Sequence, residues 1–173
     1  MITSDNIKNI MALMAEINPK LKKDFGINLT IEGFVSYRDS VNGVTDVDAD
    51  ELQNICKSSM LWHIYLTDIS GLIDVAIGKY QLVLDVYRYL DSIAVKDPDA
   101  FQIEAPKYRI DSRNIPIAIQ VLEGKIEDVE ELLKALKIVS SAMKTYAEYA
   151  DDYSKKIAAT IYAYNSRMQN NSF

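Results

Sequence analysis

Apolar residues recur at helical spacing along most of the chain, beginning at the N-terminus. Ser4 is a candidate N-cap for a short helix whose apolar face is formed by Ile7, Ile10, Met11, Met14 and Ile17. Asn18 followed by Pro19 indicates a new helix start, because proline is favoured in the first turn, and Gly26 indicates its stop. The pattern therefore predicts two short helices before residue 27.

The segment that follows, residues 27–38, fits two patterns. Its apolar residues alternate as in a strand up to Glu32, whereas Ile31, Phe34 and Val35 also fit a helix that Thr30 would open. The sequence leaves both alternatives open. Residues 1–47 are accordingly predicted to form a small helical or mixed α+β segment, with a turn at Asn42-Gly43.

A much longer periodic segment begins near Asp48, which forms a capping-box pattern with Glu51. No proline interrupts it before Pro98, so we predict one long helix. Gly71 and Gly78 share a face and would either admit a neighbouring helix or bend the segment. Its apolar stripe comprises Leu52, Ile55, Cys56, Ser59, Trp62, Leu66, Ile69, Ile73, Ala76, Tyr80, Val83, Tyr87, Leu90 and Ala94.

Pro98 and Pro106 predict an extended or turned connection near residues 97–114, after which Ser112 or Asn114 would cap a second long helix. Apolar residues in that helix alternate at spacings of three and four, which is the period of a coiled coil. Residues 167–173 are predicted to fray. The stripe comprises Val129, Leu132, Leu136, Val139, Met143, Tyr146, Ala150, Tyr153 and Ile157.

These segments predict an all-α fold in which residues 48–166 form a long, coiled-coil-like antiparallel hairpin. Two helices alone cannot cover both stripes, so we expect partner subunits to cover the remainder. A hairpin that folds back into a short bundle is the competing arrangement. The predicted oligomer or partner interface consists of Val129, Leu132, Leu136, Val139, Met143, Tyr146, Tyr153 and Ile157.

Composition adds a net charge of −6, with the acidic excess confined to the first hundred residues. This charge disfavours, without excluding, a single-stranded nucleic acid as partner. A lone cysteine, Cys56, cannot form an internal disulfide, and the N-terminus resembles no signal peptide. Charged or polar residues interrupt each apolar run. We therefore expect the cytoplasm, or a particle assembled there, and no membrane.

Candidate catalytic and metal-binding residues are few. Cys56 and His63 lie about 10 Å apart along a helix, which is beyond hydrogen-bond reach. Asp46, Asp48 and Asp50 begin like a calcium loop, but Glu51 stands where that loop needs glycine. We expect a protein that is not an enzyme and that uses no metal and no cofactor.

Eleven tyrosines are present, several of them beside cations near the C-terminus. Such a mixture can stack bases and bind phosphates, but the position of the rings on the core stripe favours an interface or the core. The basic residues near 107–113 fit a solvated loop better than a phosphate site. The candidate phosphate or nucleic-acid contacts are Lys107, Tyr108, Arg109, Arg113, Lys155 and Lys156.

The order of these features resembles one family of proteins. A long helix bearing aromatics from Met60-Leu61-Trp62 onward leads to the basic connection Lys107–Arg113, and a second long helix ends in Lys155-Lys156-Ile157. This order, over about residues 58–160, is similar to that of the UvsY family of phage recombination mediators. The resemblance implies a helical oligomer that loads a recombinase onto single-stranded DNA.

Two functional hypotheses follow from the sequence. The first is a non-enzymatic assembly protein, such as a ring, connector or scaffold subunit of a phage particle. The second is a recombination mediator that binds single-stranded DNA and a recombinase.

Overall fold

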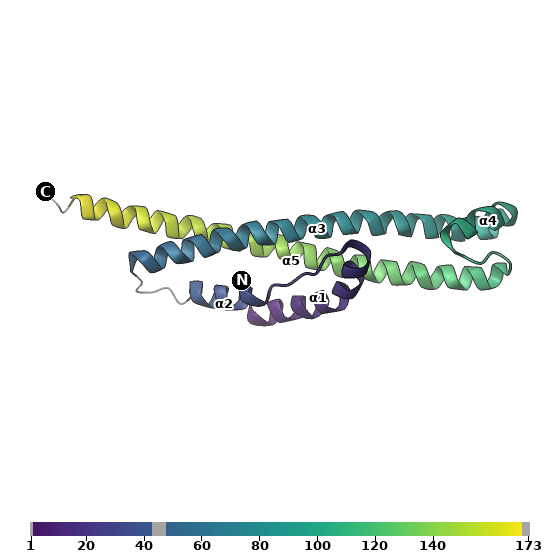
Figure 1. Ribbon diagram of the computed structural model, residues 1–173, viewed down its shortest axis with the longest axis horizontal. Helices are drawn as coiled ribbons and strands as arrows, with labels where there is room; N and C mark the ends of the chain where they lie inside the picture. The colour runs from purple at the N-terminus through teal and green to yellow at the C-terminus, as the bar shows by residue number, and fades with distance from the viewer. Residues whose placement is uncertain (1, 43–47, 171–173) are drawn as a thin grey trace. The chain divides into compact units, whose positions relative to one another are not determined.

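The computed structural model describes residues 2–42 and 48–170. The chain divides into two compact units, one formed by Met1–Ile73 with Ile138–Phe173 and the other by Asp74–Lys137. The described residues form helices and no strand, so the predicted all-α class is confirmed. In order along the chain (Figure 1), the elements are α1 (Ser4–Phe25), α2 (Glu32–Asn42), α3 (Ala49–Lys96), α4 (Pro98–Glu104), the 3-10 turn η1 (Ala105–Tyr108) and α5 (Ile115–Asn170).

Helix α1 corrects two predictions about the N-terminal segment. Thr3, not Ser4, is its N-cap, because the Thr3 hydroxyl accepts a hydrogen bond from the Asn6 amide at 3.2 Å. Pro19 lies inside α1, so the predicted break at Asn18-Pro19 is wrong. Burial explains the continuity, since the buried stripe continues past the proline. That stripe comprises Ile7, Ile10, Met14, Ile17 and Leu21.

Gly26 ends α1 as predicted. Its φ of 70° is left-handed, and its N–H group donates to the Lys22 carbonyl at 3.0 Å. The next N–H group, of Ile27, donates to the Leu21 carbonyl at 3.3 Å. The following residues, 27–31, belong to no helix or strand, and α2 begins at Glu32, two residues after the expected Thr30. The helical alternative is therefore correct from residue 32 onward, although the helix begins later than expected. The strand alternative is wrong.

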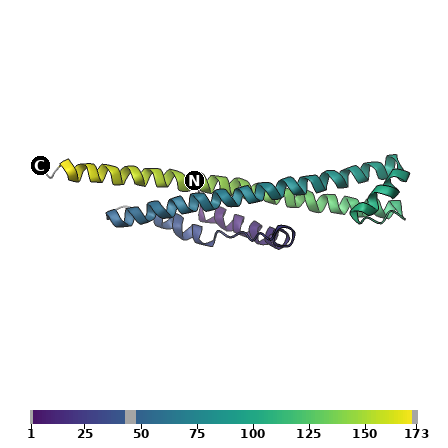
Figure 2. The same ribbon diagram turned by 45° about the horizontal axis from the view of Figure 1, so that its top comes forward.

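In the first unit, α1 and α2 lie along α3 and α5 (Figure 2). The ring of Phe34, on α2, stacks on Tyr146 of α5 with 5.0 Å between centroids, and meets Trp62 of α3 edge-on at 5.4 Å. The Tyr37 hydroxyl donates to the Ser59 hydroxyl at 2.8 Å. These contacts make one aromatic cluster the centre of this unit.

The direction of the two long helices follows from contacts within the same unit. The Cys56 thiol donates to the Ser154 carbonyl at 3.6 Å, and His63 Nδ1 lies 3.1 Å from the Ala147 carbonyl oxygen. Residue numbers rise along α3 as they fall along α5. The predicted antiparallel packing of the two helices is therefore present in this unit.

Arg38 is a buried cation that fastens the N-terminus to α2. Its guanidinium donates to the Ser4 hydroxyl at 2.7 Å and to the Ile2 carbonyl at 3.4 Å, and it forms an ion pair with Asp39. A buried charge needs such partners, because an uncompensated one is strongly destabilising. Arg38 is therefore a structural residue.

The second unit closes where α3 leads through α4 and η1 into α5. Asp97 caps α4 by accepting from the Ala100 amide at 3.1 Å, and Pro98 occupies the first turn, where its missing N–H costs nothing. The predicted extended connection is therefore largely helical. The connection is helical because α4 places the buried ring of Phe101 in the core of the unit. That core comprises Leu90, Ala94, Phe101, Ala105, Ile110, Ala118 and Leu122.

Two predicted helix caps are confirmed, and one helix is longer than predicted. Asp48 accepts from the Glu51 amide at 2.8 Å, and Asn114 accepts from the Ile117 amide at 3.3 Å, as expected of caps. Helix α5 continues to Asn170, past the point where fraying was predicted. The predicted turn residue Gly43 and the acidic residue Asp46 lie outside the described residues.

Candidate functional site

The predicted interface on α5 is not exposed. Leu136, Val139 and Met143 have no accessible surface, and the other predicted interface residues are buried or half-buried within the single chain. In the first unit the chain itself covers this stripe, as the stacking of Phe34 on Tyr146 shows. These residues therefore pack within the single chain. Their assignment to a partner interface stays a prediction.

Most of the exposed large apolar side chains lie on α3. Leu61 and Leu82 are each 67% exposed, although leucine is usually buried. Val83, which was assigned to the buried stripe, is exposed, and the neighbouring Leu84 is buried instead. The exposed large apolar side chains of α3 are Met60, Leu61, Ile64, Tyr65, Leu72, Val75, Leu82, Val83, Tyr89 and Val95.

Many of these side chains share one face of the helix. We call this face the α3 outer face and define it by positions alternating at spacings of four and three: Leu61, Tyr65, Asp68, Leu72, Val75, Lys79, Leu82 and Val86. Val86 is half-buried and the others are exposed. Within each unit this spacing places the residues on a common stripe of α3, with Leu61, Tyr65, Asp68 and Leu72 in the first unit and the others in the second.

The sequence contains the pattern of this face, but the other apolar stripe of the same helix is longer and more regular. Helix α3 carries two apolar stripes, and only the stripe with Leu66, Ile69 and Ile73 was recognised. Asp68 and Lys79 interrupt the second stripe. A search for every three-four series along the helix would have found it.

A shallow apolar hollow of about 350 Å³ lies beside the first part of this face, lined by Ser58, Leu61, Trp62 and Tyr65. Tyr65 stands at its edge because its hydroxyl donates to the Thr30 carbonyl at 2.8 Å, and burial raises the pKa of this hydroxyl. Trp62 is held from the other side by α2, where a Cβ on Gly33 would lie 3.1 Å from its ring. Residue 30 and helix α2 therefore each contact one of the side chains that line the hollow.

The candidate phosphate contacts are mostly paired with acids. Lys107 binds Glu104 at 2.7 Å. Arg113 donates to the Asp111 carboxylate from its guanidinium and from its backbone N–H, and these hydrogen bonds lower the pKa of Asp111 to about 2. Lys155 pairs with Asp151. These acids neutralise much of the positive potential that phosphate binding needs.

The remaining members of that set differ in their surroundings. Lys156 stands over the Tyr153 ring at 5.3 Å. Tyr108 is partly exposed, and Arg109 is exposed with a left-handed φ of 60° at the end of η1. Tyr108 and Arg109 thus remain accessible to a ligand.

Cys56 and His63 line a cleft of about 220 Å³ with Asp151 and Lys155. The Cys56 thiol and the Nδ1 atom of His63 both contact backbone carbonyls of α5. Across residues 2–42 and 48–170, no group of three or more His, Cys, Asp or Glu side chains is arranged to hold a metal. This cleft offers no recognisable nucleophile–base pair.

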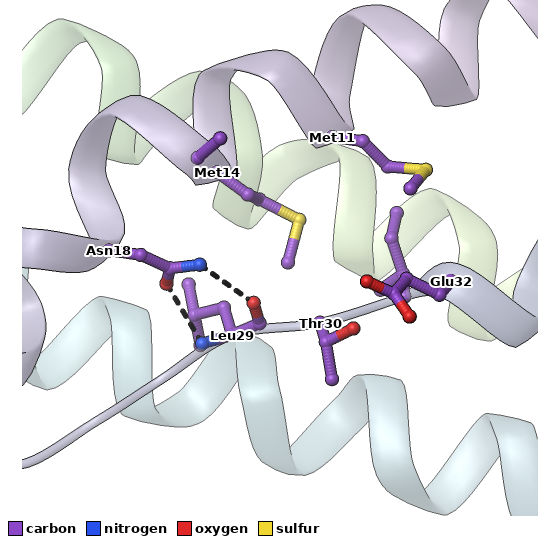
Figure 3. Close-up of a pocket in the computed structure, with 8 residues that line it drawn as sticks. Met11, Met14, Asn18, Leu29, Thr30 and Glu32 are labelled. Carbon is purple, nitrogen blue, oxygen red and sulfur yellow. Dashed lines mark hydrogen bonds between the residues drawn. The ribbon is translucent and has the colours of Figure 1, made fainter.

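A smaller cavity of about 200 Å³ lies between α1 and residues 29–32 (Figure 3). The Asn18 amide bridges its floor, donating to the Leu29 carbonyl and accepting from the Leu29 N–H, each at 2.8 Å. Met11 and Met14 wall it, and Glu32 stands at its edge. The paired bonds replace those that a neighbouring strand would supply.

We expect Asn18→Ala to loosen residues 27–31 selectively. Both backbone groups of Leu29 would lose their partners, at a cost of about 1–3 kcal/mol. Amide hydrogen exchange should accelerate at Leu29 while the amides of the second unit keep their rates. Unchanged exchange at Leu29 would contradict this role.

Helix α3 also meets a simple criterion for crossing a membrane. The stretch Asp50–Lys96 contains an 18-residue window of mean hydropathy 1.3, of which 28% is buried. This is evidence of length and composition only. The absence of a membrane partner stays a prediction.

Comparison with known proteins yields no relative: no protein-family model, curated protein or solved structure matches this chain.

Proposed function

We propose that this protein is a non-enzymatic helical assembly protein, of the ring, connector or scaffold type, which binds a partner helix through the α3 outer face. The uncovered apolar stripe on α3 is the observation that carries the proposal. Full burial of a leucine or valine side chain contributes roughly 1.5–3 kcal/mol. Leu61, Leu72, Val75 and Leu82 therefore represent a substantial unused binding energy.

The shape of the surface supports a helix as the ligand. A three-four series fits the groove of a second helix, as in coiled coils, and does not enclose a small molecule. The hollow beside Trp62 is open and apolar, so it suits an apolar side chain of the partner. Surfaces of this kind on soluble proteins commonly mark interaction sites.

The proposal is tested with Leu61→Glu combined with Leu82→Glu. Both side chains are mostly exposed, so helicity by circular dichroism should stay unchanged while the complex dissociates. Chemical crosslinking in the cells that express the chain should give a larger species for the wild type and the free chain for the variant.

Ile103→Glu with Ile117→Glu is the matched control. Ile103 and Ile117 are similarly exposed but belong to α4 and to the first turn of α5 rather than to α3. The control variant should crosslink as the wild type does. A wild-type chain that crosslinks only as a monomer would contradict the proposal.

Binding of single-stranded DNA is the second candidate function, because Tyr108 and Arg109 stay accessible. The ion pairs of Lys107, Arg113 and Lys155 weigh against it. We expect no binding of a fluorescent oligonucleotide at low salt. Tight binding that weakens steeply with added salt, and that Arg109→Ala reduces, would favour the mediator instead.

A further inference from the structure

We propose that Arg109 binds a carboxylate in an acidic segment of the partner protein, and that the rings of Tyr89 and Tyr108 hold apolar groups of the same segment. The inference rests on the proposed function, because it adds a charged contact to the apolar contacts of the α3 outer face. Arg109, Tyr89 and Tyr108, which we call the Arg109 site, all belong to the second unit and are all exposed.

The backbone at Arg109 has a conformation that favours glycine. Its φ is 60° and its ψ is 33°, and every other described residue with a positive φ is a glycine. The Arg109 N–H donates to the Pro106 carbonyl at 3.0 Å, and the Ile110 N–H donates to the Ala105 carbonyl at 3.1 Å. Gly26 occupies the corresponding position at the end of α1. A side chain costs stability there, which indicates that the Arg109 side chain serves binding rather than folding.

The Arg109 guanidinium has no ion-pair or hydrogen-bond partner within residues 2–42 and 48–170. The two other arginines of the second unit are both paired. Arg88 binds Glu130 at 2.6 Å, and Arg113 binds Asp111 at 2.6 Å. Among the arginines of this unit, Arg109 is therefore the one whose guanidinium is available to a ligand.

Two exposed tyrosines accompany Arg109. Tyr108 precedes it and is 44% exposed, and Tyr89 of α3 is 52% exposed. The hydrogen bond to Glu104 raises the pKa of Lys107, and both tyrosines lie close enough to add to this effect. Tyr89 therefore lies near η1. Arginine and tyrosine are among the residues that most often supply the binding energy of protein interfaces.

The charges around the Arg109 site favour a carboxylate over a chain of phosphates. Glu104 already neutralises Lys107, and Asp111 already neutralises Arg113. The second unit as a whole carries nine basic and twelve acidic side chains. A nucleic-acid strand needs several free cations, whereas a single guanidinium can form two parallel hydrogen bonds with one carboxylate. Tyrosine rings beside it suit the apolar part of a peptide.

The Arg109 site is tested by fluorescence anisotropy with a labelled random copolymer of glutamate and tyrosine, which presents carboxylates beside rings in every local order. The copolymer should bind the purified wild type. Arg109→Gln should weaken this binding about tenfold or more, because it removes the guanidinium. Arg113→Gln is the matched control, since it removes the same charge from an arginine that Asp111 already occupies, and it should change the affinity less than about twofold. A wild type that does not bind the copolymer would refute the inference.

Arg109→Gly separates binding from folding. Glycine relieves the left-handed position, so the midpoint of thermal unfolding should rise by about 2 °C. The same variant should lose affinity for the copolymer as Arg109→Gln does. A midpoint that falls instead would show that the Arg109 side chain stabilises the fold, and the inference would be wrong.

The outcomes separate this inference from the proposed function. If Leu61→Glu with Leu82→Glu dissociates the crosslinked complex while the wild type ignores the copolymer, the proposed function stands and the inference fails. If the copolymer binds through Arg109 while the wild type crosslinks only as a monomer, the carboxylate site stands and the helix-binding role of α3 fails. Labelled oligothymidylate that binds more tightly than the copolymer, and that Arg109→Gln releases, would assign the site to nucleic acid and overturn the inference.

Discussion

The variant Leu136→Asp is expected to lose its helical circular dichroism and to expose its core. The Leu136 side chain has no accessible surface, so the substitution places a carboxylate among apolar groups without a partner. An uncompensated buried charge costs several kcal/mol. Because whole domains are stable by only about 5–15 kcal/mol, this cost removes most of the folding free energy.

Glu131→Ala is the control on the same helix. Glu131 is exposed, and its replacement by a better helix former should leave thermal unfolding nearly unchanged. If Leu136→Asp instead kept full helicity and merely halved the mass of an oligomer, Leu136 would belong to an interface between subunits. That result would show that the apolar stripe of α5 belongs to an interface and not to the core of the single chain.

Phe34→Ala should destabilise the first unit by about 3–5 kcal/mol, the usual cost of removing a buried aromatic ring. The ring is fully buried and lies within 5.0–6.4 Å, between centroids, of those of Tyr37, Trp62, Tyr146 and Tyr149. Its loss would leave a cavity where α2 joins α3 and α5. Trp62 is the only tryptophan of the chain, so its fluorescence during urea unfolding reports directly on this cluster.

Tyr37→Phe provides the comparison within the cluster. It removes the hydrogen bond to Ser59 but keeps the ring, and should cost about 1 kcal/mol. A larger shift of the urea midpoint for Tyr37→Phe than for Phe34→Ala would show that the hydrogen bond outweighs the packing of the rings.

Helix ends were predictable where one residue decides them. Gly26 ends α1 with a left-handed φ, and Asp48 and Asn114 cap the two long helices through their own side chains. Predictions failed where a distant contact overrides the local signal. Pro19 does not break α1 because the buried stripe runs past it, and Pro98 opens a helix because Phe101 completes a core.

The candidate site was only half predictable. The excess of apolar surface over what two helices cover was visible in the sequence, and so was the expectation of a partner. The location of the uncovered surface could not be predicted, because both long helices carry apolar stripes. A stripe is exposed only if no other part of the chain lies opposite it. The eight residues expected to bind a partner are packed within the chain, and Leu61, Leu72 and Leu82 remain outside.

Local residue patterns are enough to make this protein helical, because caps, breakers and the 3.6-residue period act between residues a few positions apart. Tertiary structure alone decided which apolar stripe is core. Helices α1 and α2 pack on the long helices through contacts such as that of Phe34 with Tyr146, which lie more than a hundred residues apart. Burial depends on what lies opposite a face, and no local pattern carries that information.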